Sequence, residues 1–391
     1  MRILYVGAFR LPNKDAAAAR VLSNGKVMKA LGHSVKFYSW GGEYRLSDMC
    51  SDGKFRIEGM EYIITNELDA KGTFYHRLKA AIGRGKLSYD LIVSESSKPD
   101  LIILYNADRG WTKKVLKYCN TKGIKVANDI TEWYDNNELH IWDVIPYHIN
   151  MVKTQHLVRN KILISDYLMD YYRGSNNIKL PPLCDQMDSK WTQTIDDEHV
   201  PEYEGITLFY AGTPAQKDCI HTVLSVVNEL AFQGKPIRFL IAGISKKEYL
   251  ERYRSRLGFY EIHENIVFLG RVSQDLVPAY YKYADFMVLL REPSRKNMSG
   301  FPTKFAESIS AGVPVIANIT SDLGSYIHDF KTGFRVDSPK AENLKEVLVD
   351  KVLRLTRPEI MKMKLNVDKL KPIFDYRSYS FSVNTFLEKL Q

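Results

Sequence analysis

Short runs of β-branched and aromatic residues alternate along the whole chain with amphipathic stretches of helical periodicity. That alternation is typical of βαβ units, whose strands lie parallel in a sheet covered by helices. The sequence therefore predicts an α/β fold with two series of strands. The expected strands are Ile3–Val6, Ser34–Tyr38, Tyr62–Thr65, Leu91–Ser94, Leu101–Tyr105, Lys125–Asn128 and Ile162–Ser165, then Thr207–Tyr210, Ile237–Ala242, Ile266–Leu269, Phe286–Leu290, Val313–Ala317 and Gly333–Val336.

A chain of 391 residues is long enough for two or three domains. The segment Ile178–Asp185 holds two adjacent prolines, which cannot continue a helix or a central strand, so we expect a linker there. The two βα series on either side predict two Rossmann-like domains separated by a cleft. Because open α/β sheets bind ligands beyond the carboxyl ends of their strands, the cleft is expected to hold the chemistry. Tyr376–Leu390 has the pattern of an amphipathic helix.

The basic excess lies in the first half of the chain. Residues 1–183 hold 27 Lys and Arg against 19 Asp and Glu, whereas residues 184–391 hold 28 against 27. A basic face favours an anionic partner such as a membrane surface, a phosphorylated lipid or a nucleic acid. Phe74–Lys86 is a basic amphipathic stretch that can rest on an anionic membrane. The alternatives are scattered solvated lysines and an ordinary surface helix.

The four cysteines stand apart, without a CxxC pair or a histidine cluster beside them. Their isolation argues against a zinc site and a disulfide framework, and indicates a reducing compartment. No signal peptide is expected before the first strand, and no apolar run is long enough to span a bilayer. We therefore expect a cytoplasmic protein that at most lies on a membrane.

The segment Ser299–Asn318 carries the strongest chemical signal. A glycine loop leads into a helix at Pro302, and the free N–H groups of such a helix start bind anions. Lys304 and Glu307 follow on one helix face, so a cation and a carboxylate can hold the diphosphate and the ribose diol of a nucleotide. The alternative is a surface ion pair between these two residues.

Two further strand ends carry weaker signals. Gly212 ends one strand and Lys217 follows it, an arrangement that suits a phosphate contact. Arg271 and Val272 follow another strand end, where backbone groups can read a nucleobase edge. Ordinary βα connections explain both segments equally well, and for the second we favour that explanation.

The order of these segments resembles the donor domain of the retaining, family 4 type of GT-B glycosyltransferases (glycosyl transferases group 1). The resemblance rests on Ala211-Gly212 with Lys217, on Phe268–Ser273, on Glu307 with Ala311–Val315, and on Asp329 with Thr332–Phe334. Ile3–Gly7, Arg20-Val21 and Leu31–Val35 match the family's first domain. The resemblance covers nearly the whole chain. It implies an acceptor-side domain (1–182), a nucleotide-sugar domain (183–373) and a helix (374–391) that returns to the first domain.

The sequence departs from the family pattern at two positions. Ser299 stands where the family usually has a glutamate that contacts the donor sugar, and the amides of Gly300 and Phe301, or Glu292, are the candidate substitutes. Thr213 stands where the family often has an arginine, and Lys304 or Arg291 can supply that second cation.

The resemblance assigns the site residues. Lys217, Lys304 and Glu307 are the catalytic candidates. The acceptor-side candidates are Asp129, Glu132 and Trp133, although a core role is favoured for Trp133. The donor-binding candidates are Gly7, Arg20, Gly212, Thr213, Arg271, Val272, Arg291, Ser299, Gly300, Phe301, Pro302 and Thr303.

The implied function is transfer of a sugar, with retention at the anomeric carbon, from a UDP- or GDP-sugar to a glycan or lipid-linked glycan in bacterial surface-polysaccharide synthesis. We expect no obligate metal or cofactor. The enzyme would be cytoplasmic, at the inner face of the membrane. Three alternatives remain: a nucleotide-sugar epimerase, a non-catalytic partner subunit and, last, a nucleic-acid-binding protein, for which no reader motif is present.

Overall fold

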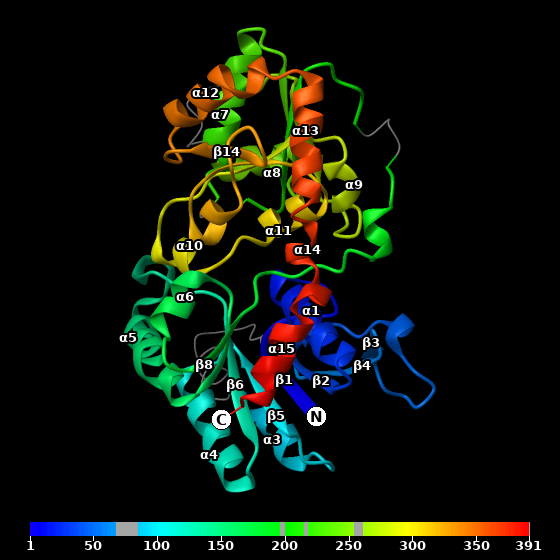
Figure 1. The fold of residues 1–391 in the computed structure, drawn as a ribbon, viewed down its shortest axis with the longest axis vertical. Coiled ribbons are helices and arrows are strands. Elements are labelled where there is room, and N and C mark those ends of the chain that lie inside the picture. The colour runs from blue at the N-terminus through cyan, green and yellow to red at the C-terminus, as the bar shows by residue number, and fades with distance from the viewer. Residues whose placement is uncertain (68–84, 196–199, 215–217, 254–260, 391) are drawn as a thin grey trace. The chain divides into compact units, whose positions relative to one another are not determined.

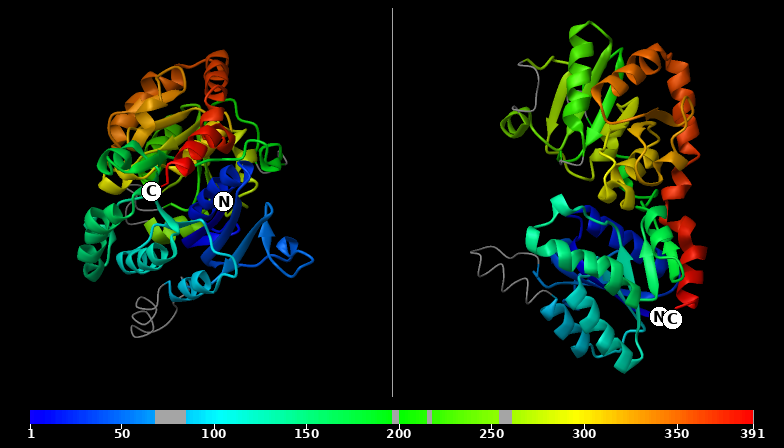
Figure 2. Two further views of the ribbon diagram at one scale, coloured as in Figure 1. Left: turned by 60° about the horizontal axis from the view of Figure 1, so that its bottom comes forward. Right: turned by 90° about the vertical axis from the view of Figure 1, so that its left-hand side faces the viewer.

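The structure, a computed structural model, describes residues 1–67, 85–195, 200–214, 218–253 and 261–390. The chain divides into two compact units (Figures 1 and 2). The first comprises Met1–Leu183, Ser299–Phe301 and Tyr376–Gln391, and the second comprises Cys184–Met298 and Pro302–Asp375. No helix in the described ranges combines the length and apolarity needed to cross a bilayer.

The first unit is built on an eight-stranded sheet of order β3-β4-β2-β1-β5-β6-β7-β8. All neighbouring strands run parallel except β3 and β4. The parallel arrangement confirms the predicted α/β class. Strands β3 and β8 were not expected, and β8 occupies the start of the predicted linker. The bounds are β1 Arg2–Leu11, β2 Ser34–Gly42, β3 Arg56–Ile57, β4 Met60–Ile64, β5 Leu101–Tyr105, β6 Lys125–Ile130, β7 Asn160–Leu163 and β8 Asn176–Lys179.

Helix α15 packs into the core of this unit, as expected. Val383, Phe386 and Leu387 are buried in the same cluster as Val21 of α1. The amide of Asn176 on β8 also donates to the carbonyl of Phe386 over 3.2 Å. The C-terminal helix is therefore an integral part of the first unit. Its described helices are α1 Ala16–Ala30, α3 Lys86–Ser94, α4 Arg109–Lys122, α5 Ile141–Ile149, α6 Asp166–Tyr171 and α15 Ser380–Glu388.

One strand prediction was wrong. The run Leu91–Ser94 is the end of helix α3, not a strand. The helix begins after Gly85, which adopts a φ of +77°, and it buries Ser88 and Ile92 one turn apart. A short run of apolar residues fits a strand and a buried helix turn equally well, because neither period repeats within it.

The second unit holds a six-stranded sheet of order β11-β10-β9-β12-β13-β14, and all its neighbouring strands are parallel. The strands are β9 Ile206–Ala211, β10 Ile237–Ala242, β11 Ile266–Gly270, β12 Phe286–Leu289, β13 Val315–Asn318 and β14 Gly333–Val336. The described helices are α7 Ile220–Phe232, α8 Lys246–Tyr253, α9 Val277–Tyr281, α10 Arg295–Ser299, α11 Thr303–Ser310, α12 Ala341–Asp350, α13 Arg357–Asp368 and α14 Lys371–Phe374.

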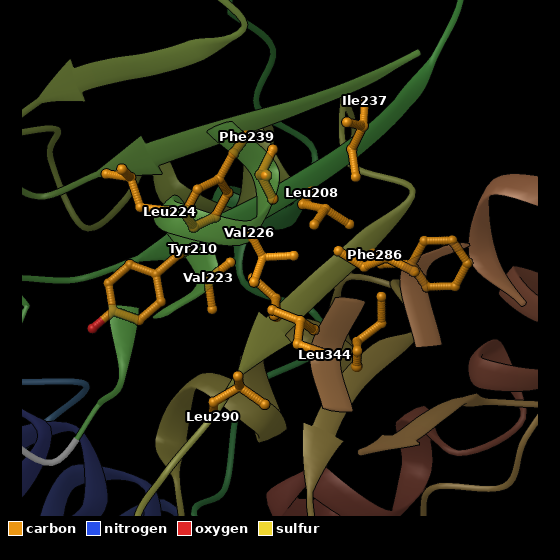
Figure 3. Packing of buried hydrophobic residues seen from close by; sticks show 14 of the residues in the cluster. Leu208, Tyr210, Val223, Leu224, Val226, Ile237, Phe239, Phe286, Leu290 and Leu344 are labelled. Carbon is orange, nitrogen blue, oxygen red and sulfur yellow. The ribbon is translucent and has the colours of Figure 1, made fainter. Parts of the chain in front are cut away.

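Helix α7 covers one face of this sheet and supplies much of the core. Leu224 and Val223 lie against Leu208, Phe239 and other strand residues (Figure 3). The apolar stripe of this helix is buried along its length. That stripe is Ile220, Val223, Leu224, Val227 and Leu230.

Lys161 on β7 is fully buried, and no carboxylate among the described residues pairs with it. Its ammonium donates to the Val158 carbonyl and, over 2.9 Å, to the Ser175 hydroxyl. Burial lowers the pKa of Lys161 from an ordinary 10.5 to about 8. Burying the charged lysine costs the folded state free energy. This cost is largest below the pKa of the folded state, and it disappears as pH rises to the pKa of the unfolded chain.

We therefore expect Lys161→Met to unfold at higher urea concentration than the wild type at neutral pH. Each pKa unit corresponds to about 1.4 kcal/mol, so the folded state is penalised by up to roughly 3 kcal/mol. The two lost hydrogen bonds offset part of this gain. The advantage of the variant should shrink between pH 8 and pH 10.5. A difference in unfolding free energy that stays constant over this range would contradict the assignment.

Candidate active site

The second sheet has a topological switch point between β9 and β12. The chain builds outward from β9 through β10 to β11, then crosses back and builds β12, β13 and β14 on the other side. Ligands of open α/β sheets bind at such a point, beyond the carboxyl ends of the two strands. Here the residues that follow the two strands meet, because Asp218 and Arg291 form an antiparallel bridge and Cys219 N–H donates to the Leu290 carbonyl over 2.9 Å.

A buried carboxylate organises this point. Asp218 is 2% exposed, and its two oxygens accept from Arg291 Nε over 2.9 Å and from Lys304 Nζ over 3.0 Å. The hydroxyl of Tyr210 donates to it over 2.7 Å. Burial alone would raise the pKa of Asp218, but Lys304 and Arg291 hold it well below its usual range. Two cations and one carboxylate leave this cluster with a net positive charge.

The end of the next strand fixes the arginine. Arg291 N–H donates to Asn318 Oδ1 over 2.8 Å, and the Asn318 amide returns a bond of 2.7 Å to the Arg291 carbonyl. Sequence reasoning proposed Arg291 but gave no role to Asp218, Tyr210 or Asn318. The available signal was a carboxylate directly after Lys217 and an asparagine that ends β13.

Glycines bring the backbone close to this cluster. Gly212 follows β9 with a φ of +126°, and a Cβ there would lie 2.8 Å from Lys304 Cε. Gly243 follows β10 with a φ of +110°, and a Cβ there would lie 2.5 Å from the Gly212 carbonyl carbon. A side chain at either position would displace the loop. The side chain of Lys304 can therefore lie against the backbone at Gly212 only because that residue is glycine.

Helix α11 begins where the sequence predicted. Pro302 is its N-cap residue, and Thr303 and Lys304 occupy its first turn. The first N–H groups of a helix lack partners within the helix and carry a partial positive charge. The helix start therefore adds to the positive potential that Lys304 and Arg291 create.

Glu307 lies one turn further along α11 and is partly buried. No hydrogen-bond partner of its carboxylate occurs among the residues that the structure describes. Burial raises the pKa of Glu307, and Lys304 and Lys190 counteract that rise only in part. A partly buried acceptor of this kind is stabilised by any ligand that donates hydrogen bonds to it.

The remaining candidates of the second unit are distributed differently. Arg271 follows β11, is exposed and pairs with Glu248 over 3.1 Å. The Gly270 carbonyl accepts from Gly243 N–H over 2.6 Å, which places the Arg271–Val272 turn beside the glycine loops. Thr213 is exposed, and its hydroxyl donates to the Gly243 carbonyl over 3.5 Å. Lys217 lies outside the described residues, as does most of Phe74–Lys86.

The loop before α11 groups with the first unit. There the Ser299 hydroxyl accepts from Trp133 N–H over 2.8 Å, and the Ser299 carbonyl accepts from the Ser165 hydroxyl over 2.5 Å. Gly300 and Phe301 are buried. Trp133 is itself buried, which agrees with the favoured core role.

In the first unit, two predicted ligand contacts pair with each other. Arg20 and Asp129 are 4% and 0% exposed, and the Arg20 guanidinium donates to both carboxylate oxygens over 2.7–3.1 Å. Tyr5 donates to Asp129 over 2.5 Å. The pairing gives both residues a structural role and leaves their predicted ligand contacts without support.

Two other candidates of this unit lie near strand ends. Gly7 on β1 has a φ of +151°, and a Cβ there would lie 2.6 Å from the Tyr105 carbonyl oxygen of β5. Strands β1 and β5 flank the switch point of the first sheet. Glu132 follows β6, is partly buried, and has its carbonyl bonded by the Tyr147 hydroxyl over 3.2 Å.

Residues 192–364, most of the second unit, match the family model described as glycosyl transferases group 1. This segment, less than half of the chain, is similar to group 1 glycosyltransferase domains. A GDP-mannose-dependent alpha-(1-6)-phosphatidylinositol monomannoside mannosyltransferase of Mycobacterium tuberculosis is 30% identical over 112 residues. That match covers 26% of this chain and 28% of the relative. The alignment thus spans little more than a quarter of the curated relative.

Solved structures match almost the whole chain. Sucrose-phosphate synthase from Thermosynechococcus elongatus gives a TM-score of 0.68 at 14% identity, over 99% of this chain and 98% of that one. Anabaena HepE, in complex with UDP and glucose, gives 0.65 at 10% identity, over 99% of each chain. Together with the two parallel sheets, this likeness confirms the GT-B fold.

Proposed function

We propose that this protein is a retaining glycosyltransferase that moves a sugar from a nucleoside-diphosphate donor to a glycan or lipid-linked glycan. The observation that carries the proposal is the positive cluster at the switch point of the second sheet. Lys304 and Arg291 meet there around Asp218, beside the start of α11. The family match to residues 192–364 supports the same reading.

The chemistry requires stabilisation of a leaving group. As the bond from the anomeric carbon to the diphosphate oxygen breaks, negative charge develops on the diphosphate. Lys304, Arg291 and the N–H groups of α11 are held in place before the reaction, and preorganised charge of this kind is usually the largest catalytic contribution. Arg291 would supply the cation that the family often places at the position of Thr213, and Lys217 would add a third. These cations would stabilise the leaving diphosphate without an obligate metal.

The carboxylate of Glu307 would hold the donor's ribose. It can accept one hydrogen bond from each of the two ribose hydroxyls, and it makes no other bond within the described residues. Such a contact replaces the hydration that burial removes, and that loss of hydration is the reason the pKa of Glu307 is raised. The backbone around Arg271 and Val272 would face the base.

The acceptor and stereochemistry complete the proposal. The matched mycobacterial relative is named for a phosphatidylinositol monomannoside acceptor, which favours a lipid-linked glycan here. Surface-polysaccharide assembly at the inner face of a bacterial membrane would supply such an acceptor. Retention would follow from front-face displacement, with the amides of Gly300 and Phe301, or Glu292, in place of the usual sugar-binding glutamate. Anomeric configuration of the product by proton NMR tests this step, and inversion would refute it.

Thermal unfolding with UDP, GDP or ADP tests the donor site. We expect one nucleoside diphosphate to raise the melting temperature, because a ligand at 100 times its Kd stabilises the folded state by about 2.7 kcal/mol. Glu307→Ala should lose most of that increase. Glu346→Ala changes an exposed glutamate of α12 and should keep it.

The outcomes separate the alternatives. No shift with any nucleotide would refute the donor site. A shift that Glu307→Ala retains in full would refute the ribose contact. Nucleotide binding without transfer or epimerisation of any sugar nucleotide would favour a non-catalytic partner subunit, whereas conversion of the sugar nucleotide in the absence of acceptor would favour an epimerase.

A further inference from the structure

Helix α5 presents an apolar face to solvent. Ile141, Trp142 and Ile145 are 75%, 77% and 70% exposed, and no residue of the helix is buried. At about 100° per residue, these three side chains fall within about 100° of the helix circumference. Asp143 lies about 100° beyond Trp142, away from the centre of that face. A helix turn with three large exposed apolar side chains is unusual on a monomeric soluble surface.

Basic residues lie on the neighbouring helix, whereas Glu138 and Asp143 beside this face are exposed and acidic. Helix α4 lies against α5 and carries Arg109, Lys113, Lys114, Lys117 and Lys122, but no acidic residue (Figure 1). Within the described ranges, none of these five side chains forms an ion pair. Elsewhere on the first unit, lysines such as Lys36 pair with carboxylates. Lys114 lies over the Tyr89 ring at 3.9 Å, and no described carboxylate neutralises the charge of α4.

The same character continues beyond α5. Val152 and Leu157 are 41% and 57% exposed, and Lys153 and Arg159 are exposed among them. No aspartate or glutamate occurs between Asp143 and Asp166. Exposed apolar side chains thus alternate with exposed cations over a continuous stretch.

We propose that α4 and α5 form a docking surface for an anionic lipid bilayer. The exposed side chains Ile141, Trp142 and Ile145 enter the interface between headgroups and acyl chains, and the cations of α4 contact the headgroups. Large apolar and tryptophan side chains next to lysine and arginine are the composition that interfacial helices use. A self-association interface is disfavoured, because the core of a protein interface is depleted of charge and of lysine in particular. The proposal does not depend on the donor chemistry.

Sedimentation with vesicles tests this surface. We expect the full-length protein to bind vesicles of phosphatidylcholine with phosphatidylglycerol at low salt, and to bind pure phosphatidylcholine weakly. Each cation near an anionic surface contributes about fivefold in affinity, so Lys113→Glu with Lys117→Glu should weaken binding by roughly twentyfold or more. Trp142→Ser should weaken it by roughly tenfold. The matched controls, Lys246→Glu with Lys247→Glu on α8 and Phe381→Ser on α15, should bind like the wild type.

Fluorescence gives a second readout. Trp40, Trp111 and Trp133 are buried, and Trp191 is partly buried in the second unit, outside the proposed surface, so vesicle binding should shift the emission chiefly of Trp142. Trp142→Phe should still sediment with vesicles but lose the shift. Failure of the wild type to bind anionic vesicles, or equal binding by Trp142→Ser, would overturn the proposal. Concentration-dependent dimerisation that Trp142→Ser abolishes would also overturn it, in favour of a second copy of the chain.

Discussion

Replacing Lys304 with alanine should lower kcat of sugar transfer by about 100- to 1,000-fold, the usual cost of losing one preorganised charge at a developing anion. Lys304 Nζ is held over glycine at Gly212 and lies 3.0 Å from Asp218, so it needs little reorganisation when the diphosphate leaves. The substitution also leaves Asp218 with Arg291 as its one remaining cation among the described residues, and some loss of stability should accompany the loss of rate.

Two measurements separate these effects. Single-turnover rates with saturating donor report on the chemical step, and urea unfolding reports on stability. Lys304→Arg keeps a cation at the start of α11 and should recover part of the rate. Lys345 pairs with Glu229 on the surface, so Lys345→Ala should leave the rate unchanged. If Lys304→Ala transfers sugar as fast as Lys345→Ala, the charge on α11 has no catalytic role.

Local patterns predicted most of the fold. Strands β5 and β10 have the predicted bounds, because each is a buried parallel strand read from a short apolar run between turn signals. Helix α11 begins at the predicted proline. The strand predicted at Leu91–Ser94 was wrong, because a short apolar segment shows neither the helical nor the strand period. Strand β8, Asn176–Lys179, holds mostly polar residues, so its pairing with β7 left no sign in the pattern.

The site was less predictable, because its contacts join residues that are distant along the chain. Lys304 and Glu307 could be paired from spacing on one helix. Asp218 reaches Lys304 across 86 residues, and only the strand order brings them together. Likewise, Arg20 and Asp129 are 109 residues apart in the sequence, so their pairing could not be predicted from spacing and each was expected to contact a ligand. Spacing identifies groups on one element, whereas topology decides which groups neutralise each other.

That buried pair leads to the largest expected effect on stability. Asp129→Ala should destabilise the first unit by about 3–5 kcal/mol, because it leaves the Arg20 guanidinium in the core without its carboxylate. The guanidinium is 3% exposed, and its remaining described bonds go to the carbonyls of Leu180 and Pro181, which cannot replace a charge. Urea unfolding followed by circular dichroism measures the change, with each unit fitted as its own transition.

The double variant Arg20→Met with Asp129→Leu separates the cost of a lone charge from the value of the pair. Removing both charges eliminates the uncompensated guanidinium, and buried pairs replaced by apolar residues are often no less stable than the original. The double variant should therefore be more stable than Asp129→Ala. Asp170→Ala breaks an exposed pair with Arg173 and should cost less than about 1 kcal/mol. If Asp129→Ala costs no more than Asp170→Ala, the guanidinium must find water or another partner, and the pair does not stabilise this unit.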